Sequence, residues 1–210
     1  MSQLQGNTID IPDKYKPIWE ASLPLLKQGR PGDDEHAAET VANVLRFADI
    51  VPFDPDVLIP VAMLHDIGHS AILPEHFKYV TGSQKVRNGK LVHMLAGAKI
   101  ARDILSAVGY PSDKSSEIVE IISMHDADQL TGLDDWRSLY DTSNKQVFHD
   151  LDSLDRYNER RLSKMVAGGY YGREQMLNEL RKMLDDFFYP EFRRLAQEEL
   201  QKLENIESHE

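Results

Sequence analysis

The chain has 210 residues, enough for one domain with a sizeable core, and carries 24 basic against 35 acidic side chains, a formal net charge of −11. This negative charge disfavours general nucleic-acid binding, and no apolar run is long and uncharged enough to predict a membrane span. The absence of cysteine excludes disulfides, thiolate metal sites and cysteine nucleophiles. Together with a polar N-terminus that lacks a signal-peptide core, it favours a cytoplasmic protein.

The hydrophobic periodicity predicts an all-α fold, because apolar residues recur at helical spacing and no strand-like alternation of useful length is present. We expect a single domain over residues 1–210, without internal repeats. The expected helices cover about residues 12–27, 34–48, 55–67, 91–108, 112–125, 142–167, 173–188 and 191–206.

The first polar residues of interest are a histidine and a neighbouring His-Asp pair. His36 lies on the helix expected at 34–48, where a lone histidine is more often a core or surface residue than a metal ligand. The helix expected at 55–67 is almost wholly apolar until His65 and Asp66. A buried carboxylate needs a partner, because an isolated buried charge is very costly. That partner is either a metal ion shared with His65 or a structural hydrogen bond to a His or Arg, and these residues alone leave both open.

Residues 70–90 are expected to be irregular, and they are also basic. Long connections inside compact domains are often lids or binding loops, so this segment is a candidate anion-binding lid. A solvated, mobile excursion is an equally supported alternative. The cations of the segment are Lys78, Lys85, Arg87 and Lys90.

Two further histidines lie on the next two expected helices. His93 is in the first turn of the helix at 91–108, and Gly97 follows one turn later on the same side, where a missing side chain lets another group approach closely. His125 lies at the inner end of an apolar stripe on the helix at 112–125.

The helix that begins near residue 142 carries three acids, which helical geometry can rank. Asp150 falls beside the apolar face, Asp155 lies at the opposite margin of that face, and Asp152 points well away. Asp150 is therefore the expected inward acid, and it needs a partner for the same reason as Asp66. Arg161 lies further along the same flank.

Inner helices thus present polar residues beside apolar stripes, and one metal centre would pair them all. Imidazole and carboxylate ligands suit Fe, Mn, Zn, Ni or Co. Their number exceeds what one ion normally needs, so a two-metal site is feasible. The candidate ligands are His36, His65, Asp66, His93, His125 and Asp150.

The order His36, then His65-Asp66, then Asp150 resembles the HD-domain superfamily of metal-dependent phosphohydrolases. The stretch "VAMLHDIGH" is similar to the central motif of that family. The stretch "VFHDLDSLDRYN" resembles its last motif, where the first acid of an Asp-x-Asp-x-Leu-Asp run is taken as the ligand and corresponds to Asp150. The similarity covers about residues 20–165, which leaves a C-terminal helical extension at about 170–207.

The resemblance implies an HD-type helical bundle in which His36, His65, Asp66 and Asp150 bind a first metal. "LVHMLAGAKI" and "IISMHDAD" resemble the segments that carry the extra histidines of dinuclear subfamilies, so His93 and His125 would bind a second metal, with Asp66 bridging the two ions. The favoured ion is Fe or Mn, with Zn, Ni and Co as alternatives. Such subfamilies include cyclic-dinucleotide phosphodiesterases and di-iron oxygenases that cleave inositol or a phosphonate.

The leading functional hypothesis is hydrolysis of a small phosphate ester, nucleotide or phosphodiester by metal-activated water. His69 stands where the cyclic-dinucleotide enzymes usually have Lys, which argues against a cyclic dinucleotide as the substrate. His69 is also the candidate proton donor or phosphate contact, beside Asp66 as the other candidate catalytic residue. The alternatives are a di-iron oxygen-dependent oxygenase and a non-catalytic metal or nucleotide sensor. The expected partner is a small anionic substrate, and the C-terminal helices could pack between subunits of a homodimer. The candidate anion contacts are His69, Lys78, Lys85, Arg87 and Arg161.

Overall fold

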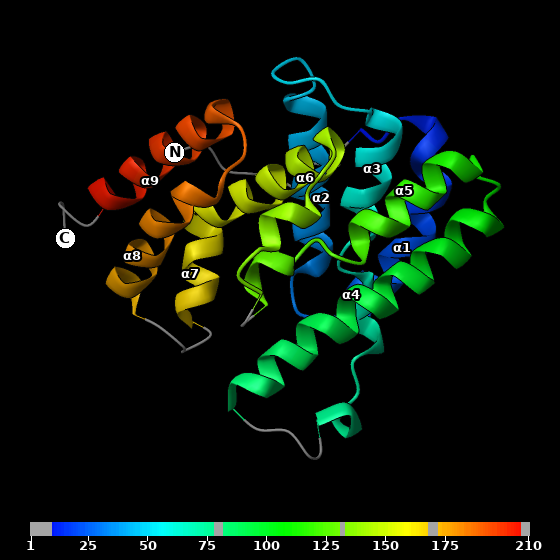
Figure 1. The fold of residues 1–210 in the computed structure, drawn as a ribbon, viewed down its shortest axis with the longest axis horizontal. Coiled ribbons are helices and arrows are strands. Elements are labelled where there is room, and N and C mark those ends of the chain that lie inside the picture. Colours follow the sequence, from blue (N-terminus) through cyan, green and yellow to red (C-terminus); the bar gives the residue numbers. More distant parts are fainter. Residues whose placement is uncertain (1–9, 78–81, 131–132, 168–171, 207–210) are drawn as a thin grey trace. The chain divides into compact units, whose positions relative to one another are not determined.

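The computed structural model describes residues 10–77, 82–130, 133–167 and 172–206, with the side chains of residues 77 and 82–88 outside the description. Over these residues it contains nine α-helices, short 3₁₀ turns and no strand, so the prediction of an all-α fold is confirmed (Figure 1). None of the described helices is both long and apolar enough to cross a membrane.

The chain forms two compact units by its internal contacts. Unit 1 comprises Met1–Arg46 and Pro55–Asp134, and unit 2 comprises Phe47–Asp54 and Asp135–Glu210. The single domain expected from the sequence stays a prediction.

Unit 1 is built around one almost completely buried helix. Every residue from Val57 to Leu64 is buried, and this helix packs against its neighbours α2 and α5. Pro55 begins it, at the position where a missing N–H costs nothing. Each buried Val or Leu contributes about 1.5–3 kcal/mol, so this helix anchors the residues that follow it. The helices of unit 1 are α1 (Lys16–Gln28), α2 (Asp33–Arg46), α3 (Pro55–Leu64), α4 (Gly82–Ala107) and α5 (Ser112–Ile122), with the 3₁₀ turns η2 (Ile67–Ala71) and η3 (Pro74–Phe77) after α3.

Two glycines bring the main chain of η2 against that of α4. A methyl group placed on Gly68 would lie 1.8 Å from the carbonyl oxygen of His93 and 2.6 Å from the amide nitrogen of Gly97. A methyl group on Gly97 would meet the nitrogen of Gly68 at 3.4 Å. The close approach expected at Gly97 is therefore present, and it places the segment after α3 directly beside His93.

Unit 2 contains the remaining helices, and its core centres on aromatic side chains. Phe192 is fully buried, and its ring meets that of Phe47 edge to face at 5.9 Å. The Tyr157 hydroxyl donates to the carbonyl oxygen of Leu180 at 2.8 Å and ties two elements together. The elements are α6 (Ser143–Leu154), η6 (Asp155–Tyr157), α7 (Glu159–Ala167), α8 (Arg173–Met183) and α9 (Pro190–Ile206).

The structure corrects the expected irregular segment at residues 70–90. Helix α4 begins at Gly82, so residues 82–90 are helical and only residues 78–81 lie outside the description. Gln, Lys and Arg are good helix formers, and the cost of one interior glycine is only about 1 kcal/mol. Gly82 and Gly89 therefore do not stop the helix, and residues 82–90 of the expected lid are its first turns.

The helix expected at 142–167 is in fact two helices. The chain leaves the helix after Leu154, and Asn158 adopts an extended conformation. Its side-chain oxygen accepts the backbone N–H of Arg161 at 2.8 Å, as an N-cap does at the start of a new helix. Side-chain capping by Asn158 thus overrides the continuing hydrophobic pattern.

Candidate metal centre

Five of the predicted ligands meet within unit 1. All five are nearly inaccessible, with exposed fractions between 0 and 6 %. Helix α2 supplies the first of them, the turn after α3 the next two, α4 the fourth, and the turn after α5 the last. They are His36, His65, Asp66, His93 and His125.

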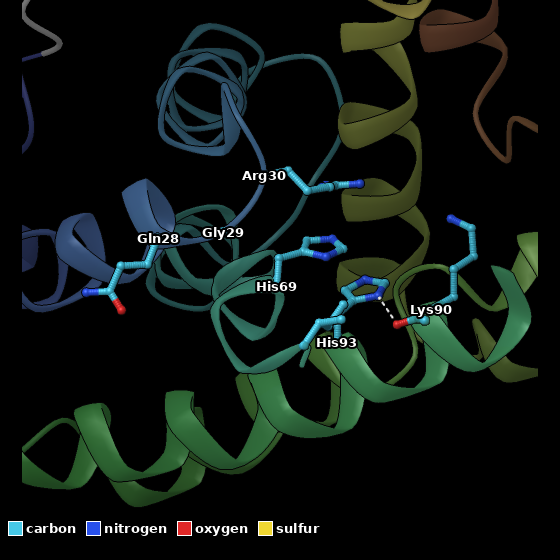
Figure 2. A pocket seen from close by; sticks show the side chains of 8 residues that line it. Gln28, Gly29, Arg30, His69, Lys90 and His93 are labelled. Atoms are coloured by element: carbon cyan, nitrogen blue, oxygen red, sulfur yellow. Dashed lines mark hydrogen bonds between the residues drawn. The ribbon is translucent and has the colours of Figure 1, made fainter. Parts of the chain in front are cut away.

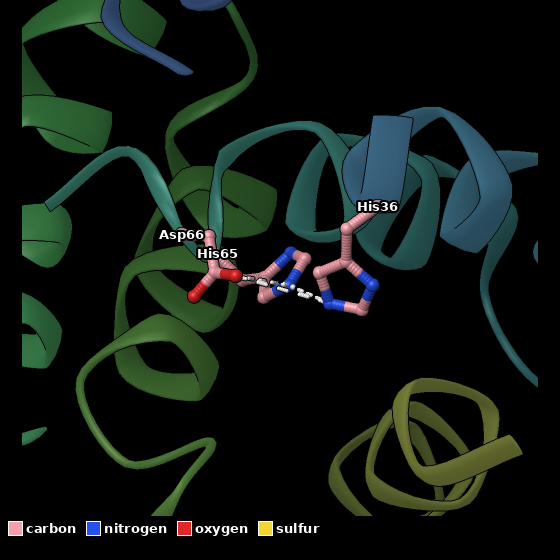
Figure 3. A group of neighbouring side chains, drawn as sticks. All are labelled: His36, His65 and Asp66. Carbon is pink, nitrogen blue, oxygen red and sulfur yellow. Dashed lines mark hydrogen bonds and ion pairs between the residues drawn. The ribbon is translucent and has the colours of Figure 1, made fainter. Parts of the chain in front are cut away.

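The first pair of imidazoles consists of His36 and His65. The Nδ1–H of His65 donates to the carbonyl oxygen of Ala62 at 3.1 Å, because a carbonyl can only accept. This leaves His65 Nε2 with a lone pair, and it lies 3.1 Å from His36 Nε2. Asp66 Oδ2 lies 3.6 Å from His65 Nε2 and 3.8 Å from His36 Nε2, and Figure 3 shows His36 reaching from α2 toward both residues.

The second pair, His93 and His125, repeats the arrangement on the other oxygen of the same carboxylate. Their Nδ1–H groups donate to the carbonyl oxygens of Gly89 at 3.3 Å and Ile122 at 2.8 Å. Their Nε2 atoms face each other at 3.3 Å. Asp66 Oδ1 lies 3.9 Å from His93 Nε2 and 3.8 Å from His125 Nε2. One carboxylate therefore stands between two imidazole pairs.

This arrangement fits divalent metal ions. Two nitrogen lone pairs about 3 Å apart repel each other unless a proton or a metal ion lies between them. Backbone carbonyls that accept the other ring N–H are the usual way in which a protein fixes the tautomer of a metal-binding histidine. Close groups that could hold an ion are His36/His65/Asp66, Asp66/His69/His93 and His93/His125/Asp126.

The protonation states suit the same role, since metals bind neutral imidazole and ionised carboxylate. Burial, and then the neighbouring His125, lower the pKa of His93 to about 3 despite the opposing charge of Asp126. Burial raises the pKa of Asp66, but positive charge beside it, from His65 whenever that ring is protonated and from the guanidinium of Arg30, holds this pKa well below the usual range of an aspartate. At neutral pH His93 is thus an imidazole and Asp66 a carboxylate.

Arg30 is a residue of the site that sequence reasoning did not identify. Its Nη2 donates to Asp66 Oδ2 at 2.7 Å, and its Nε to Asp33 Oδ1 at 3.0 Å. Burial lowers the pKa of Arg30, but Asp66 and Asp33 raise it further, so the guanidinium stays charged. Both partners considered for Asp66, the histidines of a metal site and a structural arginine, are therefore beside it. The only local signal was an Arg-Pro-Gly-Asp turn before the helix of His36.

Asp126, which forms a second His-Asp pair with the predicted ligand His125, is another residue of the site that the sequence analysis did not identify. Asp126 Oδ2 lies 3.4 Å from His93 Nε2 and accepts a hydrogen bond from Lys90 at 3.0 Å. The adjacency of the two residues in the sequence could have flagged Asp126, because it repeats the His65-Asp66 arrangement. His69, which was predicted, lies with its Nε2 3.3 Å from Asp66 Oδ1, and its ring stacks on His93 with centroids 4.2 Å apart.

Asp150 belongs to unit 2, where its carboxylate has structural partners. It accepts the backbone N–H groups of Phe188 at 3.0 Å and Tyr189 at 2.8 Å, and lies 3.1 Å from His149 Nδ1. Burial raises the pKa of Asp150 even though these hydrogen bonds oppose it. The need for a partner, on which its selection rested, is thus already met, and its role as a metal ligand stays a prediction.

The three acids of the helix expected at 142–167 follow the predicted order of exposure, but all three are buried. The exposed fractions are 0 % for Asp150, 2 % for Asp155, which begins η6, and 8 % for Asp152. The face argument assumed one buried stripe, whereas nine of the twelve residues of α6 are buried. A helix that is buried on most sides gives all of its acids an inward position.

The structure does not bring the other four candidate anion contacts together at the metal centre within its described residues. Lys78 lies outside the described residues, as do the side chains of Lys85 and Arg87 in α4. Arg161 lies on α7 in unit 2, with its Nε 3.8 Å from Asp155 Oδ2. A binding role for these four residues stays a prediction.

Asp150→Ala should destabilise the metal-free protein by about 2–6 kcal/mol, because two backbone N–H groups lose their acceptor and such a loss costs about 1–3 kcal/mol for each. Thermal unfolding in the presence of a chelator measures this, and an unchanged midpoint would exclude the structural role. The sequence further predicts that Asp150→Ala loses more metal than Asp152→Ala. Metal content of the two folded variants decides that point, and the opposite order would transfer the ligand role to Asp152.

The fold and the site define a class: an all-α domain whose buried histidines and aspartates, from separate helices, are clustered for divalent metal binding. The family model described as "HD domain" matches residues 33–157. This is more than half of the chain, so the protein belongs to the HD-domain family, whose superfamily comprises metal-dependent phosphohydrolases. Comparisons with curated proteins and with solved structures gave no match.

Proposed function

We propose that this protein is a metal-dependent phosphohydrolase that cleaves a small phosphate ester, nucleotide or phosphodiester. The observation that carries the proposal is the placement of Asp66. Its two oxygens face two separate pairs of imidazoles, at 3.6–3.8 Å on one side and 3.8–3.9 Å on the other. No structural role requires a carboxylate and four imidazoles to converge in this way.

In this proposal His36, His65 and Asp66 would hold one ion, and His93, His125 and Asp66 would hold a second. Divalent ions in such a site lower the pKa of bound water to near neutrality and neutralise charge on phosphoryl oxygens. Imidazole and carboxylate ligands suit Fe, Mn, Zn, Ni and Co, and we expect Fe or Mn.

The residues of the chain keep the ligands in their metal-binding form and supply a proton. The carbonyl oxygens of Ala62, Gly89 and Ile122 orient three imidazoles with Nε2 inward. His69 has its Nε2 at the edge of the site, 3.3 Å from Asp66 Oδ1. A protonated Nε2 there can protonate the leaving oxygen, as general acid catalysis requires.

The purified protein should contain a transition metal, and its removal with a chelator should abolish hydrolysis until Mn or Fe is added back. Elemental analysis and an assay with phosphate monoesters, nucleotides and phosphodiesters measure both effects. Metal-free protein whose activity no added ion restores would refute the proposal.

The same assay without oxygen separates the main alternative. Hydrolysis needs no oxygen and should continue at the same rate. A di-iron oxygenase on the same residues would stop, and a non-catalytic sensor would bind metal but release no product under either condition.

A further inference from the structure

A cavity of about 430 Å³ lies in unit 1 beside the proposed metal centre. Its lining includes Gly29, Arg30, His69, Lys90 and His93, and Figure 2 shows that these residues come from three separate segments of the chain. Because His93 belongs to the second imidazole pair, a molecule in this cavity contacts the site directly. Ligand pockets commonly measure about 300–1,000 Å³, so this cavity suits a small molecule.

Arg30 offers unused donors to this cavity. Its Nε and Nη2 donate to Asp33 and Asp66, while its Nη1 has no protein acceptor among the residues that the structure describes. The side chain is held by two carboxylates, so it presents a fixed, charged fork.

Lys90 brings a second cation from α4. Its ammonium group donates to Asp126 Oδ2 at 3.0 Å and to Gln129 Oε1 at 2.5 Å. An ammonium has three donors, and the third has no acceptor within the described part of the chain. Asp126 and Gln129 therefore orient Lys90 without using all of its hydrogen-bonding capacity.

His69 adds a buried polar group at the edge of the metal centre. Its side chain is 8 % exposed, and its Nε2 lies 3.3 Å from Asp66 Oδ1 without the geometry of a hydrogen bond. A ligand in the cavity can complete the hydrogen bonding of this nitrogen. Stacking on His93 holds the ring in place at the cavity.

We propose that Arg30, Lys90 and His69 form a subsite for the compact phosphoryl dianion of a small phosphomonoester or phosphonate. The inference rests on the proposed function, because bound metal ions would give the site a net positive charge that an anion compensates. Without metal, the two cations Arg30 and Lys90 face the three carboxylates Asp33, Asp66 and Asp126, and the group carries one net negative charge. One divalent ion makes it positive, and a second increases the excess.

The same chemistry selects against a neutral polyol. A tetrahedral dianion has several acceptor oxygens and can take hydrogen bonds from a guanidinium, an ammonium and an imidazole together. A neutral polyol would leave the excess positive charge of the metal-loaded site uncompensated, which is costly in a partly buried cavity. Arg30 and Lys90 are therefore specificity-determining residues, and the small volume disfavours bulky esters.

Calorimetric titration of inorganic phosphate into the full-length, Mn-loaded protein tests the subsite without turnover. Wild type should show saturable binding, and Lys90→Met should weaken it at least about tenfold, since hydrogen bonds to charged groups contribute about 1.5–3 kcal/mol. Lys90→Arg should restore most of the affinity. Lys99→Met is the matched control, because Lys99 lies exposed on the same helix, paired with Asp103, and it should stay within about twofold of wild type.

Metal content is measured on each sample, and affinities are compared at equal loading. Unchanged phosphate affinity in Lys90→Met, no saturable phosphate binding to wild type, or equally tight binding of the neutral polyol myo-inositol would each overturn the subsite. Failure of the proposed function has a different signature: the loaded wild type would bind phosphate in the Lys90-dependent way yet hydrolyse no phosphate ester.

Discussion

Asp66→Asn should leave the purified protein almost free of metal and without hydrolytic activity. The amide keeps the shape of the side chain but loses the negative charge and one of two oxygens that face the imidazole pairs. Loss of an outer partner of a metal ligand already costs roughly 10- to 100-fold in metal affinity, so loss of a shared ligand should cost more than 100-fold. Elemental analysis and titration of Mn into the chelator-treated variant measure this.

The control for this change is Asp103→Asn, an exposed acid on α4 that pairs with Lys99. It removes the same charge from the chain and should retain wild-type metal content and activity. Circular dichroism should show a helical protein for both variants. Wild-type metal content in Asp66→Asn would mean that the bridging arrangement is not what binds the ion.

Gly68→Ala should destabilise the protein more than a methyl group at Gly29, Gly97 or Gly172, because its contact is the shortest. The new Cβ would lie 1.8 Å from the carbonyl oxygen of His93, and both partners of the clash are main chain, so no side-chain rotation relieves it. Overpacking of this kind costs about 3 kcal/mol or more, which lowers the melting temperature of a chain of this size by about 6–12 °C. Thermal unfolding by circular dichroism measures the shift.

Gly172→Ala provides the comparison, because a methyl group there meets nothing within 4 Å. Its melting temperature should stay within about 2 °C of wild type, as expected for a surface change of less than about 0.5 kcal/mol. Metal binding should also fall in Gly68→Ala, since the contact with α4 positions His93 beside Asp66. A melting temperature equal to that of Gly172→Ala would show that the two main chains are not in contact at this point.

Most helices and five residues of the candidate site could be predicted from local features of the sequence. The helical period of apolar residues predicted the long helices apart from the first turns of α4 and the break between α6 and α7, and motif spacing identified five ligand candidates that the structure brings together. These features are readable because a helix and its buried face depend on residues three or four positions apart. The same locality explains the errors, since the capping by Asn158 and the early start of α4 are decided by individual residues within a continuing pattern.

Only the tertiary structure decided which charges accompany the ligands. Arg30 and Asp66 are 36 positions apart, as are Lys90 and Asp126, and no local pattern links either pair. The burial of Asp152 and the structural hydrogen bonds of Asp150 likewise depend on what packs around α6 and not on its own sequence. Pairing across such separations is set by the packing of helices against one another, and the sequence of each helix records only which of its own faces is apolar.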